Sequence, residues 1–228
     1  MLTFTSFLLS AVKYGDYDAV LRCYTLEHGY QSFFFKNVYS SKSKKKAYLF
    51  PLNELEFTVP DFKSGKMPSI SKVEWLNKNI DLQDQKLNSI RMFGAEFLDQ
   101  VFRNENGSES IYAIISNFNE RLCDKDYNAH LQLVFDVLKS NGLLPLYSED
   151  KFLNPEAGIF QQELYHQNFD ERISNLWKIY LKNSSSALPK TLRKERNLFL
   201  ESLMLYYKIH FNNFRIPDSL DILKQVYE

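Results

Sequence analysis

The sequence predicts an α+β protein in which short strands come first and helices follow. Up to about residue 80, apolar and polar residues alternate and turn residues interrupt them, which is typical of strands. After residue 80, apolar residues recur every three or four positions, which indicates helices. The chain has 228 residues, of which 44% are hydrophobic, so it can form one large domain or two small ones. With only 7 Gly and 7 Pro, long disordered linkers are not expected.

Five short strands are expected before residue 80. They cover residues 7–14, 19–25, 30–36, 48–59 and 70–76, with turns at Gly15-Asp16 and His28-Gly29. Pro51 interrupts the fourth run and indicates an edge or the start of a strand. In the third strand, the alternation assigns Phe33 and Phe35 to the core and places Phe34 on the opposite face with Lys36. Five short strands in about 80 residues favour a small barrel of the OB-fold type.

A helical bundle is expected over residues 81–228. Apolar stripes recur within residues 87–101, 111–122, 131–138, 173–180, 192–210 and 220–227. Asn141-Gly142 is a helix stop signal, and residues 143–168 form an irregular insertion. The predicted domains are therefore an OB-fold nucleic-acid-binding domain at 1–80 and a helical domain at 81–228.

Charge is concentrated locally in a chain that is neutral as a whole. Residues 1–80 carry 11 Lys and Arg against 7 Asp and Glu, whereas the complete chain carries 28 of each sign. The run Ser41-Lys42-Ser43-Lys44-Lys45-Lys46 follows an aromatic strand, and lysines beside rings suit a polyanion with flat bases. A solvated loop between two strands is the equally weighted alternative. The candidate nucleic-acid-binding residues are Phe34, Lys36, Tyr39, Lys42, Lys44, Lys45 and Lys46.

A second basic cluster lies near the start of the fifth expected helix. It consists of Lys190, Arg193, Lys194 and Arg196. A solvated helix face is the favoured interpretation, because such faces are common. A contact with DNA is the alternative.

Motifs that indicate catalysis or metal binding are absent from the sequence. It contains no phosphate-binding glycine loop, no serine-hydrolase elbow and no zinc-protease motif. The two cysteines, Cys23 and Cys123, form no Cys-x-x-Cys pair, and the four histidines lack ligand spacing. Asp16 and Asp18 flank a turn glycine, where Asp is favoured for local hydrogen bonds. We expect no enzyme, no metal and no cofactor. Without a signal peptide or membrane span, a cytoplasmic location and no membrane partner are expected.

An ordered set of motifs resembles the RecO family of bacterial DNA repair proteins. The resembling stretches are residues 13–18, 25–29, the basic loop with Phe50-Pro51-Leu52, 141–145, 154–160 and 202–210. Two departures are evident. Many family members have four cysteines in the loop that corresponds to residues 146–162, which here contains none, so zinc is not implied. The family often has glycine and arginine where this chain has Asn37 and Tyr39.

The resemblance implies a non-enzymatic recombination mediator. Such a protein binds single- and double-stranded DNA, anneals complementary strands, and with RecR helps load RecA onto strands covered by single-strand-binding protein (SSB). The acidic C-terminal tail of SSB is expected to dock on the helical domain, and the protein to associate with the nucleoid during repair. An OB-fold protein that binds RNA and a non-enzymatic interaction scaffold are the alternatives.

Overall fold

The computed structural model describes residues 1–62, 66–77, 83–103, 105–182 and 193–226. These residues form two compact units, one of residues 1–130 with 217–226 and one of residues 131–216. Strands come first and helices follow, so the predicted α+β class is confirmed. The first unit contains three helices in addition to the strands. The boundary between the compact units therefore does not coincide with the change from strands to helices near residue 80.

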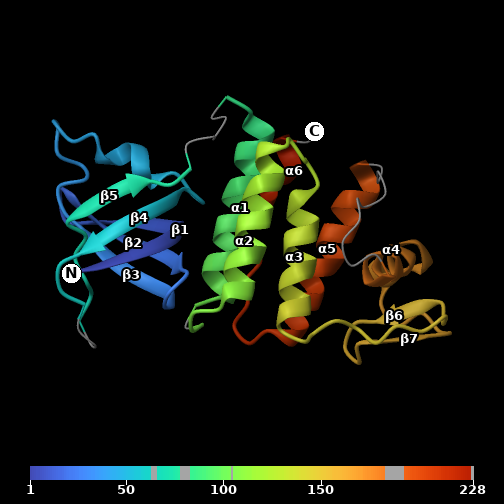
Figure 1. Cartoon of the computed structure of the whole chain (residues 1–228). Coiled ribbons are helices and arrows are strands. Elements are labelled where there is room, and N and C mark those ends of the chain that lie inside the picture. Colours follow the sequence, from blue (N-terminus) through green and yellow to red (C-terminus); the bar gives the residue numbers. More distant parts are fainter. Residues whose placement is uncertain (63–65, 78–82, 104, 183–192, 227–228) are drawn as a thin grey trace. The chain divides into compact units, whose positions relative to one another are not determined.

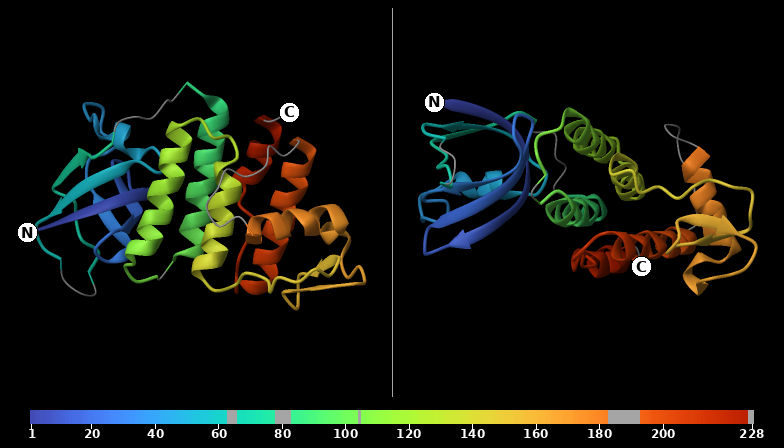
Figure 2. Two further views of the ribbon diagram at one scale, coloured as in Figure 1. Left: turned by 45° about the vertical axis from the view of Figure 1, so that its right-hand side comes forward. Right: turned by 90° about the horizontal axis from the view of Figure 1, so that it is seen from below.

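The first unit is built on a five-stranded antiparallel sheet that closes into a barrel (Figures 1 and 2). Its elements are β1 (Leu2–Tyr14), β2 (Asp18–Thr25), β3 (Gly29–Phe35), η1 (Lys45–Leu49), β4 (Glu54–Val59), β5 (Lys72–Trp75), α1 (Gln85–Val101), α2 (Glu109–Cys123) and α6 (Ser219–Val226). The strand order is β3-β2-β1-β4-β5. The Phe34 N–H donates to the Pro68 carbonyl at 2.8 Å, and the Ile70 N–H donates to the Phe34 carbonyl at 2.9 Å. These bonds join β3 to the segment before β5 and close the barrel.

The barrel interior is filled by alternate residues of each strand. Phe33 and Phe35 are fully buried there, as the alternation predicts. The register of β1 against β2 shifts between Leu8 and Ser10, where a bulge bends the strand. This bend lets one strand pair with both β2 and β4. The core also includes Phe4, Leu8, Ala19, Leu21, Cys23, Leu55, Phe57, Val59 and Ile70.

The predicted fourth strand was too long. Residues 45–49 form the 3-10 helix η1, and β4 begins only at Glu54. Pro51 has no N–H to donate to a strand ladder, and Leu52 adopts a left-handed backbone with φ of 58°. The Asn53 side chain donates to the Tyr48 carbonyl at 3.0 Å and fixes this turn.

The turn between β2 and β3 docks on the loop between α1 and α2. Gly29 has φ of 67°, and a Cβ on it would lie 2.4 Å from the Asn106 carbonyl carbon. The next N–H, that of Tyr30, donates to the Glu105 carbonyl at 3.1 Å. The Thr25 hydroxyl donates to the Gly29 carbonyl at 3.0 Å and holds the turn. Glycine is therefore required here for both its backbone angle and its lack of a side chain.

Helix α1 carries two carboxylates that connect the barrel to α6. Asp99 is buried and contacts the barrel, and Glu96 is half-buried and contacts α6. Asp99 accepts a hydrogen bond from the Tyr30 hydroxyl at 2.7 Å and pairs with Arg22 at 3.3 Å and Arg103 at 3.1 Å. Burial, followed by the hydrogen bond and charge of Asp99, raises the pKa of Tyr30 well above its ordinary value, so the hydroxyl remains a donor.

The N-terminus of α6 is capped by the second of these carboxylates. Glu96 accepts from the backbone N–H of Asp218 at 2.9 Å and of Ser219 at 3.0 Å, and from the Ser219 hydroxyl at 2.5 Å. A carboxylate at this position satisfies N–H groups that have no partner within the helix. Residues 217–226 therefore complete the first unit.

The second unit is helical with a small hairpin. Its elements are α3 (Ala129–Ser140), whose first two residues belong to the first unit, β6 (Phe152–Asn154), β7 (Ile159–Gln161), η2 (Gln167–Phe169), α4 (Glu171–Lys182) and α5 (Arg193–His210). The predicted stop after α3 is confirmed, because Gly142 has φ of 66° and the Leu143 N–H returns to the Leu138 carbonyl at 3.0 Å. Trp177 forms the centre of the core and donates to the Ser202 hydroxyl at 3.0 Å.

The insertion at residues 143–168 is tied to α5. The Tyr206 hydroxyl donates to the Leu143 carbonyl at 3.0 Å, and His210 Nε2 donates to the Pro155 carbonyl at 2.7 Å. Leu153 and Phe160 are buried. Leu146, in contrast, is 73% exposed. Its backbone N–H pairs with the Gly158 carbonyl, which directs the chain but leaves the side chain in solvent.

Candidate nucleic-acid interface

The basic loop after β3 is an ordered segment anchored to the barrel. The Asn37 N–H donates to the Asp18 carboxylate at 2.7 Å, and the Tyr39 N–H donates to the Tyr17 carbonyl at 2.8 Å. Val38, between them, is fully buried in the barrel core. Asn37 has φ of 56°, a conformation that Asn tolerates better than most residues. Asp18, the first residue of β2, thus has a structural role, but it bonds the loop after β3, whereas the sequence suggested a local bond within its own turn.

The serines of the Ser-Lys run fold the loop back on itself. The Ser40 hydroxyl donates to the Asn37 carbonyl at 3.2 Å, and the Ser43 hydroxyl accepts from the Lys45 N–H at 3.2 Å. Ser43 therefore stabilises the start of η1, since short polar side chains favour such local bonds. The loop needs no lysine–carboxylate pair to hold this shape.

Most of the loop lysines are exposed. Among the described residues, no carboxylate forms an ion pair with any of the five. Exposed ammonium groups without an acidic partner retain their donors for phosphate oxygens. The exposed members are Lys36, Lys42, Lys44 and Lys46.

Lys45 differs from its neighbours. It is half-buried, its Nζ donates to the Lys36 carbonyl at 2.8 Å, and it lies 4.6 Å from the centre of the Phe35 ring. These contacts occupy its ammonium group inside the loop. Lys45 therefore holds the loop on the barrel, and its exposed neighbours present the free charge.

Two lysine side chains lie over the Tyr39 ring. Lys13 Nζ lies 5.8 Å and Lys46 Nζ lies 5.6 Å from its centre, both in the range of cation–π attraction. Sequence reasoning missed Lys13 because it lies at the end of β1, far along the chain from the loop. The strand pairing of Lys13 with Ala19, beside Phe35, brings it to this end of the barrel.

Phe34 lies on the outer face of the barrel and is half-buried, on the opposite face from Phe33 and Phe35 as the alternation predicts. Its ring contacts that of Tyr14 edge-to-face, with centres 5.5 Å apart and planes at 82°. Tyr14 is 59% exposed, and sequence reasoning did not single it out. The signal available was a tyrosine on the same strand face as Val12, next to a turn. The two rings form an aromatic pair on the barrel surface, in which Tyr14 is exposed and Phe34 is half-buried.

The second basic cluster is only partly covered by the structure. Lys190 lies outside the described residues, and Arg193 and Lys194 are the first two residues of α5. Arg196 is only 9% exposed, so its guanidinium is not part of a solvated helix face.

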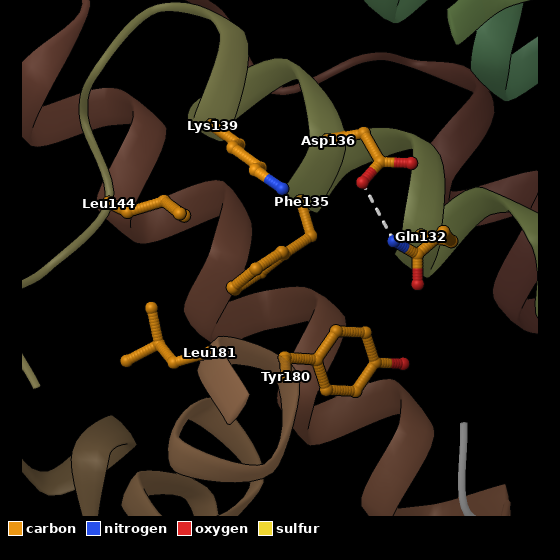
Figure 3. A pocket seen from close by; sticks show the side chains of 7 residues that line it. All are labelled: Gln132, Phe135, Asp136, Lys139, Leu144, Tyr180 and Leu181. Atoms are coloured by element: carbon orange, nitrogen blue, oxygen red, sulfur yellow. Dashed lines mark hydrogen bonds between the residues drawn. The ribbon is translucent and has the colours of Figure 1, made fainter. Parts of the chain in front are cut away.

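The second unit contains a small hollow between α3 and α4 (Figure 3). Phe135, Leu144, Tyr180 and Leu181 line its apolar part, and the Gln132 amide donates to Asp136 at 2.7 Å on its rim, near Lys139. With a volume of about 30 Å³, it has room for about one water molecule. This hollow is not a preformed site for an aromatic side chain or a cofactor.

Two further features are absent from the described residues. No group of three or more His, Cys, Asp or Glu side chains is arranged to hold a metal ion in the described ranges. None of the helices there is both long enough and apolar enough to cross a bilayer.

The fold and this surface define a class of protein, an OB-like five-stranded barrel with a cationic loop at one end, followed by helices. Residues 1–79 match the family model described as "Recombination protein O N terminal". The chain is 30% identical over 233 residues to "DNA repair protein RecO" of Christiangramia forsetii and 28% identical over 229 residues to that of Flavobacterium psychrophilum, with 96% of each chain covered. It is also 28% identical to the protein of that name from Phocaeicola vulgatus, again with 96% of each chain covered.

The chain belongs to the RecO family of DNA repair and recombination proteins. The family resemblance inferred from the sequence motifs is thereby confirmed.

Proposed function

We propose that the protein binds single- and double-stranded DNA through the loop lysines and anneals complementary strands. The observation that supports this most directly is a group of exposed ammonium groups at one end of the barrel that have no ion-pair partner within the described part of the chain, those of Lys36, Lys42, Lys44 and Lys46. Each ammonium that neutralises a phosphate releases condensed counterions, which favours binding at low salt. Annealing requires two polyanions to approach, and a cationic surface lowers their mutual repulsion.

Within this proposal, the protein acts with RecR to load RecA onto strands covered by SSB. Membership of the RecO family supports these partners, and we assign no contact residues to RecR or to the SSB tail. The hollow in the second unit is a poor candidate for the acidic, apolar-ended tail of SSB, because it has room for only about one water molecule.

A salt titration tests the DNA-binding proposal. The variant with Lys42, Lys44 and Lys46 replaced by Ala is compared with the wild type on labelled single-stranded and duplex DNA. If all three contact phosphates, the slope of log K against log salt falls by about 2 on single strands and by about 2.7 on duplex. Unchanged slopes would exclude the loop as the DNA-binding surface.

A matched control removes the same number of positive charges elsewhere. Lys72, Lys151 and Lys182 are exposed but paired with Glu74, Glu171 and Glu149, respectively. Replacing these three by Ala should leave the slopes unchanged, because their ammonium groups already have partners. If both triple variants lower the slope by the same amount, only the net charge of the protein matters, as the scaffold alternative expects. Comparison with RNA of the same length tests the RNA-binding alternative.

A further inference from the structure

Tyr39 is held in place at the end of the barrel by its backbone. Its backbone N–H is bonded to Tyr17 at 2.8 Å, and the preceding Val38 is buried in the core. Two lysines from different elements approach this one ring, Lys13 from the end of β1 and Lys46 from η1. Both side chains are exposed.

We propose that Tyr39 is a positioning residue that gathers Lys13 and Lys46 into one binding site for the phosphates of a DNA backbone. This inference rests on the proposed function and deepens it. It adds Lys13 to the DNA-binding surface and gives Tyr39 a role different from the base stacking that the sequence suggested.

Placing two ammonium groups close together costs free energy. Like charges repel, and each free lysine side chain has many rotamers to lose when it binds a phosphate. The electron-rich ring face attracts both cations and restricts both chains before DNA arrives. A lysine held over a ring retains N–H donors that point away from it, and these remain available for phosphate oxygens.

The geometry suits a backbone and not a base. The two nitrogens can be separated by no more than the sum of their distances to the common ring centre, 5.8 Å and 5.6 Å. Successive phosphates of one strand are separated by roughly 3.4 Å of rise along the helix axis, so two ammonium groups within this limit can reach phosphates that are near neighbours on one strand. The two ammonium groups over the ring also compete with a base for its face. The site should therefore serve single strands and duplex alike.

The test uses the full-length protein in salt titrations with a labelled single-stranded oligonucleotide and a duplex of equal length. Lys13→Ala should lower the slope by about 0.7 on single strands and by about 0.9 on duplex, the loss of one phosphate contact. Lys72→Ala, which removes an exposed lysine already paired with Glu74, is the control and should leave both slopes unchanged. An unchanged slope for Lys13→Ala would overturn the inference.

Two substitutions of Tyr39 separate positioning from stacking and from simple structure. Tyr39→Phe keeps the ring and should bind like the wild type. Tyr39→Leu should weaken binding to both DNA forms, and Lys13→Ala should then cost less in the Leu background than alone. If Tyr39→Leu weakens only single-strand binding, the ring stacks a base and the inference is wrong. If Tyr39→Leu does not fold, as judged by its melting temperature, the Lys13 titration still decides.

The Lys42, Lys44 and Lys46 triple variant is measured in parallel. If it flattens the slope while Lys13→Ala does not, this inference fails and the proposed function stands. If neither variant changes the slope, both fail.

Discussion

Replacing Gly29 by Ala gives a sharp test of how the barrel is held to its helices. Two costs are expected. The left-handed backbone at φ of 67° costs an L-residue about 1–2 kcal/mol. The added Cβ would also lie 2.4–2.5 Å from backbone atoms of Glu105, Asn106 and Gly107, so that loop must move.

The loop movement has a cost that follows from its hydrogen bonds. The Tyr30 N–H bond to the Glu105 carbonyl at 3.1 Å and the Tyr24 hydroxyl bond to the Asn106 carbonyl at 3.3 Å would be lost or weakened. At about 0.5–1.5 kcal/mol each, they bring the total loss in free energy of unfolding to about 2–5 kcal/mol.

Urea unfolding followed by circular dichroism measures this loss, and Gly15→Ala is the matched control. Gly15 has φ of 58°, but a Cβ there meets nothing within 4 Å. The control should therefore cost only the backbone strain, about 1–2 kcal/mol. If Gly29→Ala costs no more than Gly15→Ala, the close approach of the turn to the helix loop does not contribute to stability, and the reasoning is refuted.

Three further predictions concern the site and the insertion. Phe34→Ala and Tyr14→Ala should each weaken single-strand binding by about 1–3 kcal/mol while duplex binding changes less, if the pair stacks an unpaired base; equal losses on both DNA forms would contradict stacking. Lys45→Ala should lower the melting temperature more than Lys44→Ala, because only Lys45 covers Phe35 and bonds the loop; equal melting temperatures would deny it this role. Chelator treatment should leave the melting temperature unchanged, since the insertion lacks thiols, and one zinc per chain by elemental analysis would contradict this.

Local sequence patterns predicted those features that depend on residues close together in the chain. Alternation placed Phe33 and Phe35 in the barrel core, and Asn141-Gly142 correctly marked the end of α3. Both signals operate over a few residues, so a sequence contains them directly. The early part of β1 was missed because it lies before the apolar run from which the strand was recognised.

Features that depend on long-range pairing were beyond the sequence patterns. The association of Lys13 with Tyr39 follows from strand register and barrel closure, and the buried state of Arg196 from the packing of its unit. Likewise, the serines and lysines of residues 40–46 indicated a polar loop, but not that Lys45 would turn inward over Phe35. Tertiary contacts decide such cases.

The cap that Glu96 provides for α6 has a consequence for synthesis on the ribosome. The helix that completes the first unit is made only after residues 131–216, which belong to the second unit. At about 5–20 residues per second, synthesis of residues 131–216 alone takes roughly 4–17 s, and during this time the partner surface on α1 has no α6 to bind. During that interval the nascent barrel and its two helices expose an apolar face, which chaperones would be expected to cover. The order of translation therefore places the last step in maturation of the first unit after the second unit has emerged.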